Sequence, residues 1–195
     1  MNYPRMIRIR QQFNAPVVSD LAAVVRQQVT DGATTAGIGA GESVAVAVGS
    51  RGISNLAAIV SATVEALRGI GSEPFIFPAM GSHGGATSEG QIEVLGRYGI
   101  RESSVGAPIR SEIVPTEVGR TDDGIRVYVD KNALAADHIV LINRVKPHTG
   151  FAGEIESGLM KMMLIGLGKH KGALVYHRAI IHHSFEKIVR TVGRI

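Results

Sequence analysis

Three short apolar runs, each followed by a glycine-rich turn, constrain the fold of this chain most strongly. The runs are Ser43 to Val48, Pro74 to Met80 and His138 to Asn143. Segments with the apolar periodicity of amphipathic helices lie between them. Buried strands that alternate with helices are typical of a mostly parallel sheet covered by helices. The sequence therefore predicts an α/β fold.

Helix signals mark four segments: residues 21–29, 54–68, a segment opened by Ser88, and a last one that begins near Ser184. Asp20 is placed to cap the first helix, and Asp31-Gly32 is placed to end it. Gln91 follows Ser88 at the spacing of a capping box. We predict these four helices with those ends.

A β-hairpin is expected between the second and third strands. Two runs of alternating polarity flank the segment Arg120 to Gly124, which contains Asp123-Gly124. An Asp-Gly pair between such runs favours a tight turn that joins antiparallel strands. We predict a hairpin added to the parallel sheet.

Length and cysteine content limit the class of protein. A chain of 195 residues, 45% of them hydrophobic, is long enough for one domain with a real core. The absence of cysteine excludes disulfide scaffolds, thiolate metal clusters and cysteine nucleophiles. The N-terminal residues lack the apolar region of a signal peptide, and no run has the roughly 18 apolar residues of a membrane helix. We expect a cytoplasmic protein that does not contact a membrane.

The positive charge is concentrated late in the chain. The net charge is +4, and the stretch from Arg144 to Arg178 contains six basic residues against Glu154 and Glu156. A nucleic-acid surface usually combines a basic stripe with stacking aromatic residues, and neither is evident. We predict a local site for a small anion and no nucleic-acid partner. A solvated basic face is the alternative.

The candidate chemistry lies in the turns that follow the three apolar runs. These turns contain Arg51, His83 and His148, in the sequences GSRG, GSHGGAT and RVKPHTGFAG. The carboxyl ends of parallel strands meet at one edge of a sheet, and main-chain N–H groups in such turns attract anions. Two imidazoles at that edge could serve the two faces of one carbon centre as acid and base. Alternatively, the arginine is a surface residue and each histidine only supports its own loop.

Lys161 lies within the apolar run GLMKMMLIG. Burial without a partner lowers the pKa of a lysine, which suits a nucleophile or a covalent cofactor anchor. A lysine that extends its ammonium group to the surface is the alternative. Four histidines follow, and one of them is a candidate metal ligand: His170, His177, His182 and His183. No carboxylate lies near them at metal-site spacing, so a site made only of protein ligands would be incomplete.

The motifs VGSRGIS, AMGSHGGATSEGQ and NRVKPHTGFAGEIESGLMKMMLIGLGKHKGA resemble the N-terminal domain of the nickel-dependent lactate racemase family. The resemblance implies that residues 1–195 form the cofactor-binding, catalytic N-terminal domain of a two-domain enzyme. It implies an isomerase, a racemase or epimerase of a 2-hydroxy acid, which moves the substrate's α-hydride to a cofactor. The second domain of the family lies outside this sequence, so we expect the isolated chain to be inactive.

The resemblance also assigns roles to residues. The cofactor it implies is a nickel-pincer nucleotide, pyridinium-3,5-bisthiocarboxylic acid mononucleotide nickel. By motif, His83 and His148 are similar to the catalytic acid/base pair, and Arg51, Lys161 and His177 to cofactor-binding residues. Of these, Lys161 matches the lysine joined to the cofactor, and His177 matches the nickel ligand. The insertion EIESGLM before Lys161 leaves covalent attachment open. A non-catalytic module that binds a phosphorylated small molecule is the alternative function.

Overall fold

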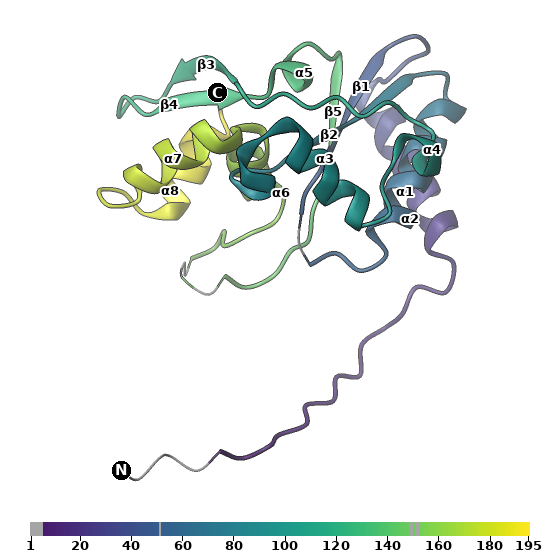
Figure 1. Cartoon of the computed structure of the whole chain (residues 1–195), viewed down its shortest axis with the longest axis horizontal. Coiled ribbons are helices and arrows are strands. Elements are labelled where there is room, and N and C mark those ends of the chain that lie inside the picture. The colour runs from purple at the N-terminus through teal and green to yellow at the C-terminus, as the bar shows by residue number, and fades with distance from the viewer. Residues whose placement is uncertain (1–5, 51, 149, 151–152) are drawn as a thin grey trace.

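The computed structural model describes residues 6–50, 52–148, 150 and 153–195. Its strands are β1 (Ser43–Val48), β2 (Glu73–Pro78), β3 (Thr116–Arg120), β4 (Arg126–Val129) and β5 (His138–Ile142) (Figure 1). Its helices are α1 (Leu21–Ala36), α2 (Leu56–Gly69), α3 (Ser88–Arg97), α4 (Glu102–Val105), α5 (Lys131–Leu134), α6 (Leu159–Lys161), α7 (Lys169–Ala179) and α8 (Phe185–Val192). Two further helical segments differ from an α-helix. The 3-10 turn η1 (His83–Ala86) is wound more tightly, and the π-helical segment η2 (Met162–Leu167) is wound more widely.

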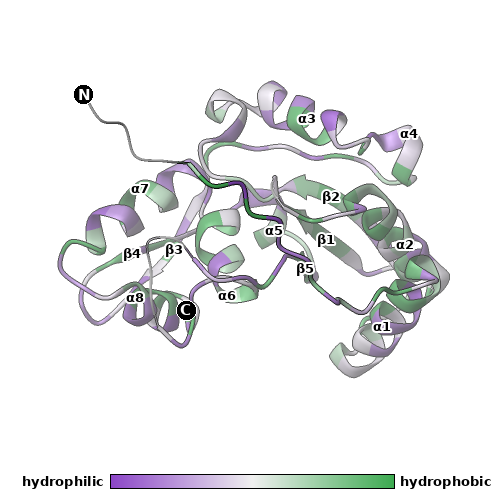
Figure 2. Ribbon diagram, turned by 90° about the horizontal axis from the view of Figure 1, so that it is seen from below, coloured by the Kyte–Doolittle hydropathy of each residue, from purple (hydrophilic) through white to green (hydrophobic). Residues whose placement is uncertain are grey.

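The central sheet is parallel, with the strand order β2-β1-β5. Val48 at the end of β1 aligns with Pro78 of β2 and Ile142 of β5, so all three strands end at the same edge. Alternate residues of β1 face two different cores. Val46 packs with the α2 side of the sheet, whereas Ala45 packs with the side that η2 covers. Figure 2 shows the sheet between α1 and α2 on one side and α6, α7 and α8 on the other.

The predicted hairpin is present as β3 and β4, which pair antiparallel. It packs against α7 and α8 through a separate apolar cluster that includes Val127, Tyr176 and Ile188. The main-chain N–H of Tyr128 also donates to the Tyr176 hydroxyl at 3.2 Å, which ties β4 to α7. The parallel sheet, its covering helices and the added hairpin confirm the predicted α/β fold class.

The end predicted for the first helix is wrong. α1 continues through Asp31-Gly32 and ends at Ala36, where Gly37 has φ 72° and its N–H bonds back to the Ala33 and Thr34 carbonyls. A glycine inside a helix costs only about 1 kcal/mol relative to alanine. The side chain of Gln27 donates to Asp31 one turn later at 2.9 Å, which supports the helix across the weak position.

The cap predicted for α3 is also wrong by one residue. Thr87, not Ser88, is the N-cap, and its hydroxyl accepts from the Gly90 N–H at 3.1 Å. Gln91 makes no capping box. It is fully buried and turns into the protein, where it contacts the loop after β2. Ser184, by contrast, caps α8 as predicted by accepting from the Lys187 N–H.

The loop after β2 and the start of α3 are packed main chain against main chain. Gly84 has φ 60°, a conformation that favours glycine. A Cβ atom on Gly90 would lie 2.0 Å from the Gly84 carbonyl oxygen and 2.8 Å from Thr87 Oγ1. Both glycines are therefore required for the turn that places His83.

This contact predicts opposite effects for two substitutions in α3. We expect Gly90→Ala to lower the free energy of unfolding by about 1 to 3 kcal/mol, because the new methyl group overlaps the Gly84 main chain. Gly96→Ala in the same helix meets only the flexible Arg101 side chain at 3.8 Å or more. It should raise the stability by about 0.5 to 1 kcal/mol. Urea unfolding of both variants is the measurement, and equal effects would contradict the packing described.

Candidate functional site

The three loops with candidate chemistry leave one edge of the sheet, as predicted. The loop after β1 contacts the loop after β5 and the segment η2. Arg144, after β5, donates from Nη1 to the Gly52 carbonyl at 2.9 Å. A Cβ atom on Gly49 would lie 2.8 Å from Cε of Met162 in η2, so the glycine leaves room for that side chain. Arg51, the predicted cofactor-binding residue of this loop, lies outside the described residues.

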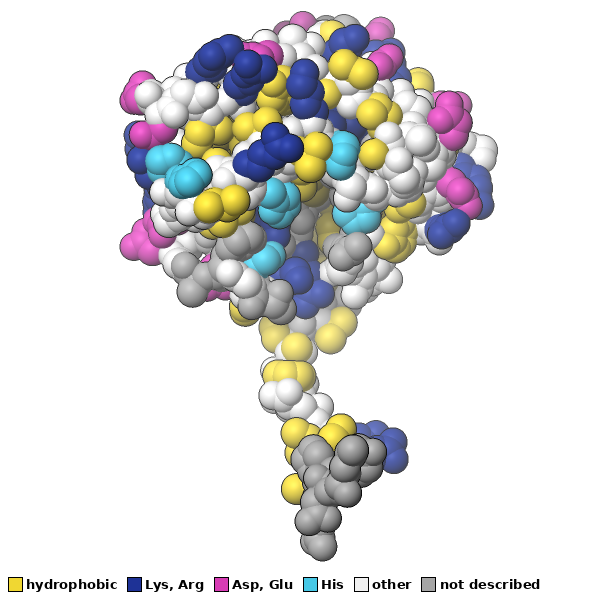
Figure 3. Space-filling view, turned by 60° about the vertical axis from the view of Figure 1, so that its left-hand side comes forward, with side chains coloured by type: hydrophobic (Ala, Val, Ile, Leu, Met, Phe, Trp, Pro, Cys, Tyr) yellow, Lys and Arg dark blue, Asp and Glu magenta, His cyan; other side chains and the backbone are white. Residues whose placement is uncertain are grey.

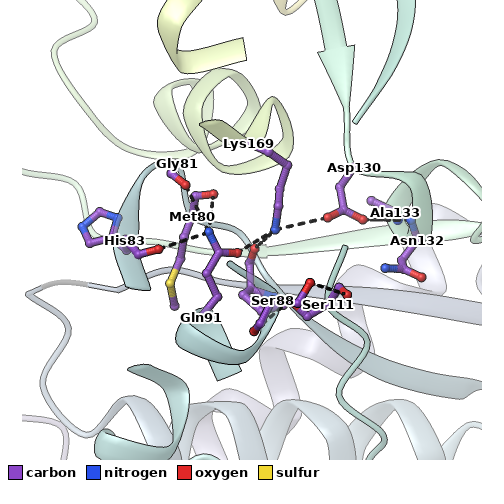
Figure 4. A network of polar contacts seen from close by, with 11 residues as sticks. Met80, Gly81, His83, Ser88, Gln91, Ser111, Asp130, Asn132, Ala133 and Lys169 are labelled. Carbon is purple, nitrogen blue, oxygen red and sulfur yellow. Dashed lines mark hydrogen bonds and ion pairs between the residues drawn. The ribbon is translucent and has the colours of Figure 1, made fainter. Parts of the chain in front are cut away.

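The loop after β2 carries His83 and is held from beneath by Gln91. The Gln91 amide nitrogen donates to the carbonyls of Gly81 at 3.0 Å, Met80 at 3.4 Å and His83 at 3.5 Å. Figure 4 shows the His83 carbonyl turned toward Gln91 and the imidazole directed away from it. Both ring nitrogens of His83 are shielded from solvent by the protein. Gln91 therefore holds the main chain of the His83 loop through its carbonyl groups.

The loop after β5 carries His148 and is braced by the segment that precedes α6. The His148 N–H donates to the Glu156 carboxylate at 2.8 Å, and the Lys146 N–H donates to Ser157 Oγ at 2.8 Å. The Ser157 hydroxyl in turn donates to the Lys146 carbonyl. Glu156 and Ser157, which belong to the segment EIESGLM, therefore support the His148 loop. Sequence reasoning considered this segment only as an insertion that leaves covalent attachment at Lys161 open.

Phe185, the first residue of α8, brings His148 and Lys161 together. The ring centroids of Phe185 and His148 are 6.5 Å apart, with 21° between the ring planes. The Lys161 ammonium nitrogen lies 5.9 Å from the Phe185 ring centroid. Sequence reasoning missed Phe185, because nothing in the local pattern separates a site aromatic from a core residue at the start of a helix.

The electrostatics of this group favour a neutral imidazole. Partial burial, and then the nearby ammonium groups of Lys161 and Lys146, lower the pKa of His148, although the Glu156 carboxylate opposes them. Burial and the charge of Lys146 also lower the pKa of Lys161. His148 is thereby suited to accept a proton near neutral pH.

His177 lies on α7, exposed to solvent. It is one helical turn after Ala173, whose methyl group would lie 3.5 Å from a Cβ atom on Gly81. The face of α7 that includes Ala173 thus meets the His83 loop. Among the described residues, no group of three or more histidines and carboxylates could hold a metal ion. Figure 3 shows histidine and basic side chains gathered around a hollow on one face of the molecule.

The residue that sequence reasoning missed most completely is Lys169. It was counted only as part of a basic stretch, yet it is 1% exposed. Its ammonium group donates to the Pro78 carbonyl at 2.7 Å and to the Gln91 side-chain oxygen at 2.9 Å, and lies 3.4 Å from the buried Asp130 carboxylate. Burial lowers the pKa of Lys169, and Asp130 opposes this effect. Figure 4 shows these contacts beside the segment that carries Gly81 and His83.

A cavity of about 530 Å³ lies elsewhere, bounded by β4, α5, β5 and the end of α8. Its lining is mainly apolar and contains none of the four predicted site residues that the structure describes. We therefore place the candidate site at the sheet edge, where the titratable side chains converge.

A comparison with protein families agrees with the motifs at this edge. The family model described as the lactate racemase N-terminal domain matches residues 9–188. This chain belongs to that family. No curated protein sequence matches the chain significantly.

The match to the lactate racemase N-terminal domain includes all four described site candidates and the Lys169 network. The family description implies a separate C-terminal domain and a racemase role. The predicted family resemblance is confirmed. Within the described residues, no helix of this lactate racemase domain is long and apolar enough to cross a membrane.

The charges around His148 predict a specific titration. Lys161→Gln removes the ammonium group that lowers the pKa of His148 more than Lys146 does, so this pKa should rise toward its usual value near 6.5. NMR titration of the imidazole measures the shift. Lys131→Gln, at an exposed lysine on α5, is the control and should leave the His148 titration unchanged.

The same titration affects stability with a definite sign. Because the pKa of His148 is lower in the folded chain than in the unfolded chain, the unfolded chain binds the proton more readily. Stability should therefore fall as the pH drops through about 6.5 toward the folded-state pKa. In Lys161→Gln this loss should be smaller. An unchanged His148 titration in that variant would contradict the proximity of the two groups.

Proposed function

We propose that this domain is the catalytic half of a 2-hydroxy acid racemase or epimerase, with His83 and His148 as its acid/base pair. The strand order carries the proposal. His83 follows β2 and His148 follows β5, and these strands lie on opposite sides of β1. A substrate bound over the end of β1 would have one imidazole toward each face. Inversion of a carbon centre requires such access from two sides.

The two imidazoles would move the proton of the substrate hydroxyl. The lowered pKa of His148 keeps its ring neutral and able to accept that proton. The proton returns to the hydroxyl oxygen when the product forms. For the other enantiomer His83 takes the same part from the opposite side. Lys146 and Lys161 place positive charge where a substrate carboxylate could bind.

The residues present fit a nickel-pincer nucleotide. The described residues offer single metal ligands and no cluster of three, so the remaining donors would come from the organic part of the cofactor. Sulfur, carbon and imidazole donors form a chemically sensible environment for nickel. His177 would be the protein ligand, and Arg51 and Lys161 would contact the nucleotide. When bound, the cofactor supplies an acceptor for the substrate's α-hydride.

We further propose that a C-terminal domain completes the site and that residues 1–195 alone are inactive. Exposed apolar side chains beside the catalytic loops support this arrangement, among them Val145 at 81% and Leu159 at 52% exposure. Such side chains are suited to be covered by a second domain. Cytoplasmic location and the lack of a nucleic-acid partner stay predictions.

Substitution of three histidines in the cofactor-loaded, full-length enzyme tests the proposed roles. His83→Ala or His148→Ala should lower turnover in both directions by about 10² to 10⁴-fold, because a racemase must process both enantiomers. Nickel content should stay near normal in these two variants. His177→Ala should instead reduce nickel content, because it removes a metal ligand. Racemisation assays and metal analysis are the measurements.

Two outcomes would contradict this assignment. Full activity in the His83 or His148 variant would remove that residue from the acid/base pair, and unchanged nickel in the His177 variant would show that another group binds the metal. A wild-type protein, produced with the cofactor-synthesis enzymes, that holds neither nickel nor sulfur would favour the module that binds a phosphorylated molecule.

A further inference from the structure

We propose that Lys169 is a positioning residue for His83, acting through Gln91. This inference rests on the proposed role of His83 in the reaction. It concerns a residue that lies outside the catalytic edge and is too deeply buried, at 1% exposure, to meet a substrate itself.

The chemistry of the contacts fixes which way the Gln91 amide points. An ammonium group can only donate hydrogen bonds, and a main-chain carbonyl can only accept them. Because Lys169 donates to the Gln91 oxygen, the amide nitrogen must face the opposite side. There it meets the carbonyls of Gly81 and His83. A flipped amide would place donor against donor at Lys169 and acceptor against acceptor at the loop carbonyls.

Lys169 is itself held firmly in place. Its ammonium group is fixed between the Pro78 carbonyl and the Asp130 carboxylate. Asp130 cannot easily move, because its other oxygen accepts from the Asn132 and Ala133 N–H groups at the start of α5. The network is therefore fixed at the start of α5, and through Gln91 it restrains the loop that carries His83.

The main chain at Lys169 supports a specific need for this side chain. Its φ angle is 56°, in the left-handed region that is unfavourable for residues with a Cβ atom. Glycine would adopt this angle without strain. The lysine is retained here because the hydrogen bonds and ion pair of its ammonium group stabilise the fold by more than the strained main chain costs.

The contacts converge on the segment that leads to His83. Pro78 ends β2, and the three carbonyls bound by Gln91 belong to the five residues that follow. On its other side, Lys169 follows η2, the π-helical segment that begins directly after Lys161. The network thus joins the start of α7, which follows Lys161 and η2 in the chain, to the loop that carries His83.

Two variants separate positioning from general stability. Lys169→Met combined with Asp130→Asn removes both charges together, so no buried charge is left without a partner, and the asparagine oxygen can still cap α5. Gln91→Glu keeps an oxygen for Lys169 but replaces the amide donor that faces the loop carbonyls. Lys131→Met, at an exposed lysine beside Asp130, is the matched control.

The experiment uses the full-length enzyme loaded with cofactor and measures the mobility and accessibility of the His83 loop. We expect amide hydrogen exchange in residues 79–87 to be about tenfold faster or more in both test variants, because the loop loses its anchor. Modification of His83 by diethyl pyrocarbonate, followed by mass spectrometry, should accelerate similarly as its ring nitrogens become accessible. Turnover should fall by about 10 to 100-fold with a smaller change in KM. The control should match wild type in all three measurements.

The outcomes are distinguishable. Unchanged loop exchange and unchanged His83 modification in both variants would overturn the positioning role of Lys169. A looser loop with full turnover would support the hold of Lys169 on the loop and contradict the catalytic role of His83. If the double variant does not fold, Gln91→Glu decides the question, because it keeps the buried ion pair intact.

Discussion

The arrangement of loops at the candidate site depends on the burial of one ammonium group. Lys169 joins the end of β2, the first turns of α3 and the start of α5 through Pro78, Gln91 and Asp130. A charge at this depth requires all its partners, since the loss of one typically costs about 3 to 5 kcal/mol. These elements are therefore restricted to one arrangement. The position of the His83 loop is fixed in turn, because Gln91 binds its main-chain carbonyls.

The parallel sheet supplies the second constraint. With β1 between β2 and β5, the loops that carry His83 and His148 leave the sheet on either side of the loop that contains Arg51. The hairpin and α8 pack together with η2 and α7, and α8 brings Phe185 to His148. A layered core and a set of ordinary turns are thus enough to gather imidazole and ammonium groups at one edge.

Local patterns predicted most of this frame and missed its buried network. The strand Ser43–Val48 has the predicted bounds because a run buried on both faces leaves a continuous apolar signal. The end of α1 was missed, because a helix tolerates Gly32 when neighbouring contacts support it. Lys169 could not be identified, since its partners are 91 and 78 residues away and its own neighbours show no unusual pattern. Long-range polar contacts leave little trace in local periodicity.

We have proposed that His83 and His148 serve opposite faces of one substrate at this edge. A crystal structure of the full-length enzyme with cofactor and a bound 2-hydroxy acid tests it most directly. We expect His177 on the nickel ion and one imidazole on each side of the substrate, within hydrogen-bond reach of its hydroxyl at about 2.6 to 3.2 Å. Both imidazoles on the same face of the substrate, or a substrate bound away from the end of β1, would contradict it.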